Sequence, residues 1–239
     1  MNFQRARTDE QRSQRRRHIL DTTAAMLTEM PVAKLSLNEL SRRVGLAKAN
    51  VLRYFESREA ILLQLLDVEL QDWLAELEQW PEPVQGTPRE RGDRLARILA
   101  ESLAERPVLC DLISAQAAVL ERNVSAEVAR EHKYALLRSY QSLAQLARRH
   151  LPELGKEDAF RLTGFTSLAA GASWPYLQPS QELVAAYPED PVVVAMHVDF
   201  ADVVRQSLEV AISGLLTRQE DVPLGAGPLD TIPPHIEQK

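Results

Sequence analysis

The fold is decided by residues 35–60, LSLNELSRRVGLAKANVLRYFESREA. Ser36 precedes an apolar-periodic run and Glu39 follows three residues later, which is the pattern of a capping box at the start of a helix. The apolar residues then recur at three- and four-residue spacings, on one helical face. Gly45 follows the last of them, where a left-handed residue ends a helix without steric cost. The pattern predicts a short helix between Ser36 and Gly45.

A second short helix is predicted over residues 48–55, only two residues after Gly45. Two short helices around a tight turn are typical of a helix-turn-helix unit. The polar side chains on the outer side of the second helix are those that read DNA: cations for phosphates and guanine edges, an amide for adenine, and a phenol for backbone oxygens. These residues are Lys48, Asn50, Arg53 and Tyr54.

The whole chain has 239 residues, of which 45% are hydrophobic, enough for one large or two small domains with a substantial core. Alternating β-branched runs bounded by hairpin signals are absent from the sequence, so we expect an all-α protein of about nine helices. The single cysteine excludes an intrachain disulfide. No apolar run is long enough to span a membrane and no secretory signal is recognisable, so we expect a cytoplasmic protein.

The net charge of −6 is unevenly distributed. Residues 1–58 contain 12 Lys and Arg against 6 Asp and Glu, a net +6, whereas residues 59–239 contain 16 against 28, a net −12. A basic N-terminal end on an acidic body fits DNA binding, because the phosphate interaction depends on the local patch and not on the charge of the whole chain. Basic N-termini are also common in proteins that do not bind DNA.

Turn and charge signals divide the chain into five parts. Residues 1–11 are expected to form a basic flexible arm. A first helix from about Arg12 to Met30 carries four arginines near its start, where their charges are repelled by the positive end of the helix dipole. Contact with DNA phosphates would relieve this repulsion. We expect the head to comprise residues 12–58, with its motif at 36–55, a connecting helix 59–80, a helical domain 81–220 and a disordered tail 221–239.

The head resembles the TetR family of bacterial transcriptional repressors. The resemblance rests on three stretches: Ser36-Leu37-Asn38-Glu39-Leu40, then Gly45 through Tyr54-Phe55, and Ser57-Arg58-Glu59-Ala60-Ile61-Leu62 at the start of a long helix. It covers about the first third of the chain. It implies a DNA-binding head followed by a helical domain that binds a small-molecule effector and dimerises, with a palindromic double-stranded DNA operator as the partner.

Two positions depart from the family pattern. Leu52 stands where the family usually has a tyrosine that touches a phosphate, and Ala47 replaces the usual serine cap, worth about 1 kcal/mol. The motif and the resemblance together give these candidate DNA-binding residues: Ser36, Leu37, Asn38, Ala47, Lys48, Ala49, Asn50, Arg53, Tyr54, Arg58 and Arg16.

The last two predicted helices, 157–174 and 190–218, carry apolar stripes wide enough for an internal face and a second face. The resemblance implies that this second face forms a homodimer, and full burial inside one subunit is the alternative. The candidate dimer residues are Phe165, Leu168, Ala172, Phe200, Val204 and Leu208. The candidate lining residues of an effector pocket are Cys110, Gln116, Tyr134, Trp174 and Tyr176, each of which could equally be packing.

The sequence contains no phosphate-binding glycine loop, no HExxH and no C-x-x-C, and its five histidines have no metal-ligand spacing. We therefore expect no enzymatic activity and no cofactor or metal. The alternative to a regulator is a helical small-molecule-binding or enzymatic protein whose head has lost its function. The sequence does not decide between repressor and activator, nor does it identify the effector.

Overall fold

The structure, a computed structural model, describes residues 2–80, 85–177 and 198–218. These residues contain nine α-helices and no strand, which confirms the predicted all-α fold. The helices are α1 (Asn2–Leu27), α2 (Leu37–Val44), α3 (Lys48–Val51), α4 (Arg58–Leu77), α5 (Pro88–Ala104), α6 (Pro107–Ala115), α7 (Ala126–His150), α8 (Lys156–Tyr176) and α11 (Phe200–Thr217).

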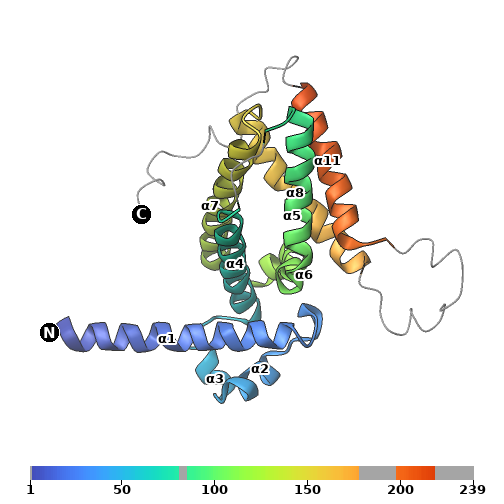
Figure 1. The fold of residues 1–239 in the computed structure, drawn as a ribbon. Helices are drawn as coiled ribbons and strands as arrows, with labels where there is room; N and C mark the ends of the chain where they lie inside the picture. The colour runs from blue at the N-terminus through green and yellow to red at the C-terminus, as the bar shows by residue number, and fades with distance from the viewer. Residues whose placement is uncertain (1, 81–84, 178–197, 219–239) are drawn as a thin grey trace, which may run out of the picture.

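Helices α1, α2 and α3 form a small head at one end of the molecule, and α4 runs from the head into the body (Figure 1). A 3-10 turn, η1 (Val32–Lys34), joins α1 to α2. In the body, α11 packs on α5 and α8, α8 also packs on α6 and α7, and α4 packs on α7. Since α4 belongs to both parts, its tilt sets the position of the head.

Side chains predicted to cap helices do so. The Ser36 hydroxyl accepts a 3.2 Å hydrogen bond from the backbone N–H of Glu39, and the Ser57 hydroxyl accepts one of 3.0 Å from Ala60. Gly45 ends α2 with φ 72°, in the left-handed region that favours glycine. The helix-turn-helix boundaries near Ser36 and Gly45 are therefore confirmed, although α3 is shorter than the predicted 48–55 and continues as turns after Val51.

Helix α1 begins at Asn2, so residues 2–11, which were expected to form a flexible arm, continue the helix in this structure. The reason is local: this stretch has neither Pro nor Gly and is rich in Gln and Arg, which favour helix. Helix α11 begins at Phe200. Residues 190–197 of the predicted helix 190–218 lie outside the described residues, as does the predicted tail 221–239.

Residues 107–123 do not form one continuous α-helix. Helix α6 ends at Ala115, a π-helical turn, η2 (Gln116–Leu120), follows, and a 3-10 turn, η3 (Glu121–Asn123), leads to α7. Tyr134 of α7, a candidate pocket residue, is 41% exposed. The buried positions on that part of α7 are instead His132, Ala135 and Ser139.

Candidate nucleic-acid interface and body cavity

The outer side of α3 and of the residues that flank it is exposed. Ala47, Lys48, Ala49, Asn50 and Arg53 are all exposed. Among the described residues, the side chains of Lys48, Asn50 and Arg53 have no hydrogen-bond or ion-pair partner. Two cations and an amide that are free of internal partners can bind phosphates and base edges.

The start of α2 lies beside this surface in the motif. Ser36 and Asn38 are exposed and Leu37 is partly exposed, as a DNA-contacting helix end requires. Ala47 makes no side-chain cap on α3, as its sequence implied. The side chain of Leu52 is 39% exposed and has no polar atom, so it cannot form a hydrogen bond to a phosphate. Tyr54 is half-buried against the core of the head.

Arg16 does not lie free on the DNA side. Its guanidinium donates to the backbone carbonyl of Tyr54 and to the side-chain oxygen of Gln64 in α4, and it stacks 4.3 Å from the centroid of the Phe55 ring. Burial, together with the charge of Arg12, lowers the pKa of Arg16. In this structure Arg16 joins α1 to the turns that follow α3 and to α4, while Arg12, Arg15 and Arg17 of the same helix are exposed, and its contact with DNA stays a prediction.

Arg58 is also held inside the protein. One of its terminal nitrogens donates to the carbonyl of Leu35 at 2.7 Å, and the other lies 2.9 Å from a carboxylate oxygen of Glu59. Its charge is neutralised and its donors are occupied, so it fixes the start of α4 against the segment before α2. The structure gives Arg58 this positioning role, and its contact with DNA stays a prediction.

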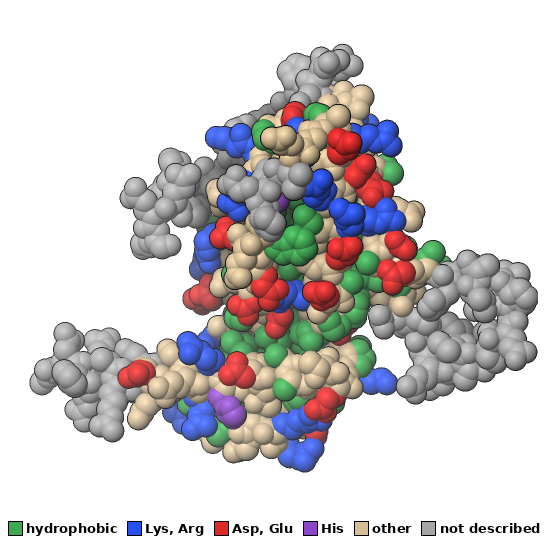
Figure 2. Space-filling model, viewed as in Figure 1, with side chains coloured by type: hydrophobic (Ala, Val, Ile, Leu, Met, Phe, Trp, Pro, Cys, Tyr) green, Lys and Arg blue, Asp and Glu red, His purple; other side chains and the backbone are tan. Residues whose placement is uncertain are grey.

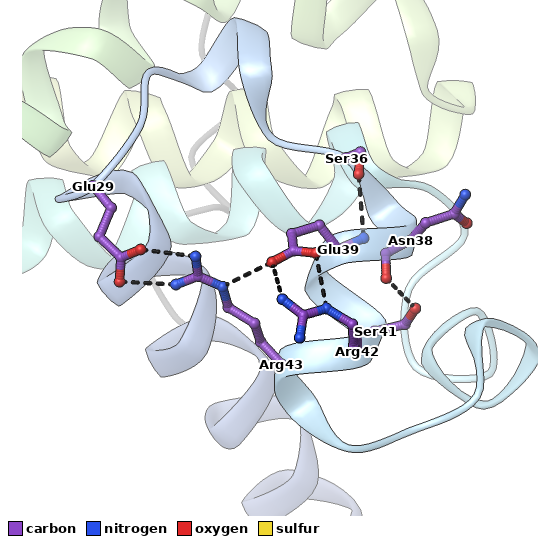
Figure 3. A network of polar contacts seen from close by, with 7 residues as sticks. All are labelled: Glu29, Ser36, Asn38, Glu39, Ser41, Arg42 and Arg43. Atoms are coloured by element: carbon purple, nitrogen blue, oxygen red, sulfur yellow. Dashed lines mark hydrogen bonds and ion pairs between the residues drawn. The ribbon is translucent and has the colours of Figure 1, made fainter.

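The cations of α2 form an ion-pair network with two glutamates (Figure 3). Arg43 makes a two-bond pair with Glu29 at 2.7 and 2.8 Å and also donates to Glu39 at 3.2 Å. Arg42 donates to Glu39 at 2.6 and 3.0 Å. The hydrogen bonds from Arg42 and then Arg43 lower the pKa of Glu39 to about 2. The network ties α2 to the end of α1 and leaves α2 with little net positive charge.

The reciprocal capping box predicted at Ser36 and Glu39 is half formed. Ser36 accepts from the backbone of Glu39, but the Glu39 carboxylate binds the two arginines and not the backbone of Ser36. The complete box occurs at Thr87 and Glu90, at the start of α5. An ion pair to a guanidinium is a stronger attraction for the carboxylate than a neutral N–H, which accounts for the difference.

Figure 2 shows Lys and Arg side chains together with some Asp and Glu on the lower end of the molecule, where the head lies, and both kinds interspersed over the body, so the excess of positive charge on the head is seen in the count of residues. That count gives a net charge of +6 for residues 1–58. The field that a DNA phosphate meets at the head is therefore more favourable than the whole-chain charge suggests.

The predicted dimer residues fall on two different faces. Phe165 and Leu168 on α8 are 46% and 69% exposed, and Ala172 one turn later is exposed. Phe200, Val204 and Leu208 on α11 are instead buried within the subunit, at 7%, 0% and 0% exposed, because this face of α11 packs on α5 and α8. This burial inside one subunit is the alternative that the sequence left open, and a dimer role for these three residues stays a prediction. The outer face of α11 carries Val210, 75% exposed, and Gly214.

The body contains a narrow cavity with room for about one water molecule. None of the five predicted pocket residues lines it. Cys110 is buried with its thiol donating to the carbonyl of Leu103, Trp174 packs edge-on against Phe200, and Tyr134 and Tyr176 are exposed. The cavity is lined by Leu70, Trp73, Leu74, Leu103, Ile113, Ser139, Tyr140, Leu143, Thr163, Thr166, Ser167 and Ala170. The missed signal is the row of small hydroxyl side chains among the apolar residues in the middle of α8.

Gln116 belongs to a row of hydrogen-bonded polar side chains and does not line the cavity. Its amide nitrogen donates to Glu121 at 2.8 Å and lies 3.0 Å from Nε2 of His132, whose Nδ1 lies 2.7 Å from Asp67 in α4. Burial raises the pKa of Asp67, although its bond to His132 opposes the rise. These contacts fit an imidazole that donates from Nδ1 and accepts at Nε2. This row of hydrogen-bonded side chains joins α4, α7 and the π turn.

Within residues 2–80, 85–177 and 198–218, no group of three or more His, Cys, Asp or Glu side chains could hold a metal ion. None of the helices in that part of the chain is long and apolar enough to cross a membrane.

Two family descriptions match the chain. Residues 19–65 match "Bacterial regulatory proteins, tetR family" and residues 67–219 match "Tetracyclin repressor-like, C-terminal domain". No curated protein sequence matches.

Among solved structures, a TetR transcriptional regulator from Rhodococcus sp. RHA1 is similar, with a TM-score of 0.56 and 13% sequence identity over 87% of this chain and 98% of that chain. PfmR, a TetR family transcriptional regulator from Thermus thermophilus, has a TM-score of 0.49 and 18% identity over 82% of this chain and 98% of its own. At this identity, the Rhodococcus structure shows a shared fold.

Proposed function

Because the chain belongs to the TetR family of bacterial regulatory proteins, we propose that it is a sequence-specific transcriptional repressor that binds DNA as a homodimer and leaves its operator when a small molecule enters its body. It works as a binding protein in the cytoplasm and performs no reaction. The observation that carries the proposal is the exposed surface of α3, where Lys48, Asn50 and Arg53 have no partner among the described residues.

The division of the head's cations supports DNA binding. Arg16, Arg43 and Arg58 are occupied by internal partners, whereas Lys48 and Arg53 stay free beside the motif's turn. Because these two exposed cations have no internal ion pair, a DNA phosphate can bind them without displacing a partner. Two such surfaces in a dimer would meet successive major grooves about 34–36 Å apart.

The DNA test is selection of bound sequences from a random double-stranded pool by the full chain. We expect a palindromic consensus and an affinity that falls steeply with salt. Lys48→Ala and Arg53→Ala should each weaken binding and reduce the salt slope by about 1. Lys156→Ala, an exposed lysine at the start of α8, is the matched control. A pool that returns no consensus would favour a helical binding protein with an inactive head.

The outer faces of α8 and α11 support a dimer. Phe165, Leu168, Ala172 and Tyr176 follow one another at three- and four-residue spacings, and Leu168 and Tyr176 are 69% and 75% exposed. Val210 on α11 is 75% exposed. An apolar stripe on two packed helices suits a two-fold contact in which each copy contributes the same pair.

Sedimentation of the full chain tests the dimer. We expect a dimer that Leu168→Glu converts to a folded monomer, since two introduced carboxylates would be buried near the two-fold axis. Val119→Glu is the control, since it also replaces an exposed apolar residue by glutamate. Val119 is 39% exposed but lies in the π turn, outside the stripe, so this variant should leave the dimer intact. A wild-type monomer at micromolar concentration would refute this part of the proposal.

Release by a ligand requires that the ligand bind one spacing of the two heads better than the other. The body cavity is enclosed by residues of α4, which also enters the head, so a molecule that widens it would change the tilt of α4. Binding of the selected DNA, repeated with a panel of small molecules, tests this step.

A further inference from the structure

The cavity between α4, α5, α6, α7 and α8 has two unlike walls. One wall is apolar and includes Leu70 and Trp73 of α4 and Leu103 of α5. The indole N–H of Trp73 is occupied by the Ser102 hydroxyl at 2.9 Å, so the indole offers the cavity no free donor. This wall can contribute dispersion contacts and the removal of apolar surface from water.

The opposite wall, from α7 and α8, carries hydroxyl groups. Thr166 is 2% exposed and its hydroxyl donates to the carbonyl of Leu162 at 2.8 Å, one turn back in its own helix. Thr163, at 1% exposed, donates likewise to Phe160 at 2.7 Å. Each hydroxyl has one proton, so both oxygens can still accept but not donate. The Ser139 hydroxyl, in a residue 7% exposed, and the lining hydroxyls of Tyr140 and Ser167 have no hydrogen-bond partner among the described residues and can accept or donate, so Thr163 and Thr166 are the two positions that require a donor from the ligand.

The lining contains no Lys, Arg, His, Asp or Glu among the described residues. A carboxylate or ammonium placed there would lose its hydration without gaining a counter-charge, at a cost far above that of a neutral polar group. A neutral group that brings its own proton would instead meet acceptors on α7 and α8.

We propose that this cavity binds uncharged, largely apolar molecules that carry a hydroxyl or a comparable hydrogen-bond donor, with the donor directed at Thr166 and Ser139 and the apolar part against Leu70 and Trp73. The inference rests on the proposed ligand-responsive function and specifies its ligand class. The cavity as it stands holds about one water, so the ligand enters by parting the two walls. In the described part of the chain, no hydrogen bond joins a lining side chain of one wall to a lining side chain of the other.

The test uses the full chain and four probes of equal chain length, each below its critical micelle concentration: 1-decanol, methyl decyl ether, decanoate and decyltrimethylammonium. Binding is measured by calorimetry and by tryptophan fluorescence at pH 8. We expect decanol to bind most tightly, the ether about fivefold more weakly because it lacks the donor, and the two ions more than about tenfold more weakly.

Variants locate the binding. Thr166→Val keeps the shape and removes the acceptor, so decanol should lose about fivefold in affinity and the ether should be unaffected. Thr217→Val is the matched control, because its hydroxyl makes the same bond to its own helix, at 2.8 Å to Ser213, on the exposed side of α11. Ser139→Ala should weaken decanol in the same direction as Thr166→Val.

Three results would overturn the proposal: tighter binding of decanoate or the ammonium than of decanol, no binding of any probe, or equal decanol binding to Thr166→Val and the wild type. DNA binding is measured separately on the selected operator. If decanol binds as described and the operator complex persists, the ligand class holds and ligand-driven release fails. If no operator is found, the DNA-binding function fails while the probe measurements still decide the cavity.

Discussion

The carboxylate of Asp111 in α6 accepts a 2.6 Å hydrogen bond from the backbone N–H of Val32, in the turn between α1 and α2. Val32 is 2% exposed, so this N–H is shielded from water. A second bond of the same kind joins the head's Glu56 to the N–H of Ser125 at 2.6 Å. The body thus holds the head at two points besides α4.

Asp111→Ala should lower the free energy of unfolding by about 1–3 kcal/mol, because the Val32 N–H would be left buried and unpaired. Asp111→Asn should cost less, since its amide oxygen can still accept. Denaturation in urea at a fixed protein concentration measures the loss, and hydrogen exchange of the Val32 amide locates it. Asp21→Ala, an exposed aspartate of α1, is the control. An unchanged exchange rate at Val32 in Asp111→Ala would contradict the role given to this bond.

Gly92→Ala should destabilise the body by about 1–3 kcal/mol. A Cβ at this position of α5 would lie 2.8 Å from Cγ2 of Ile212 in α11, closer than two carbons can approach. The measurement is a double-mutant cycle with Ile212→Ala, which removes the obstructing methyl. The double variant should lose less stability than the two single variants added together. Strict additivity would mean that the clash is relieved elsewhere.

The elements that the sequence predicted best are those specified by neighbouring residues. The Ser36 cap and the Gly45 terminus depend on positions within one turn of the helix, and both were predicted correctly. The second half of the capping box was not, because Glu39 binds Arg42 and Arg43 of the same helix, and Arg43 is in turn held by Glu29, which follows the end of α1. An interaction that requires the tertiary fold leaves no local signal.

The two faces of α11 show the same limit. Phe200, Val204 and Leu208 form one apolar stripe and Val203 and Val210 contribute to another, and the sequence does not say which stripe faces inward. The packing of α5 and α8 decides it. The cavity was missed for a related reason: large polar and aromatic side chains were expected to line it, whereas Thr163 and Thr166 are small and resemble ordinary helix residues in sequence.

Glu39→Gln should reduce thermal stability in a pH-dependent manner. Hydrogen bonds from Arg42 and Arg43 lower the pKa of Glu39 to about 2 from an ordinary value of 4.5. A carboxyl with a depressed pKa stabilises the folded state above its unfolded pKa, and this contribution is lost as the pH falls through the folded value. The difference in melting temperature between wild type and Glu39→Gln should therefore be constant above about pH 5.5 and shrink from about pH 4.5 downward.

Glu101→Gln, at an exposed glutamate of α5 without an ion pair among the described residues, should show no such convergence. A melting-temperature difference for Glu39→Gln that stays constant down to about pH 3 would show that the arginines do not hold this carboxylate in solution. The expected difference is small at any pH, since exposed ion pairs are screened by solvent.

Arg16→Met should weaken operator binding without changing its salt dependence. The guanidinium of Arg16 donates hydrogen bonds to the backbone carbonyl of Tyr54, in the segment of turns that follows α3, and to the side chain of Gln64 in α4. Loss of these charge-assisted bonds lets the segment shift, and we expect about tenfold lower affinity. Because Arg16 makes no phosphate contact in this arrangement, the slope of log affinity against log salt should equal that of the wild type.

Arg53→Ala provides the contrast, because it removes a free cation from the DNA surface and should reduce the slope by about 1. Arg16→Lys should recover part of the affinity, since an ammonium can donate to the Tyr54 carbonyl but cannot reach both partners in the fixed fork of a guanidinium. Circular dichroism of each variant establishes that the head stays folded. A slope that falls by about 1 in Arg16→Met would instead identify Arg16 as a phosphate contact.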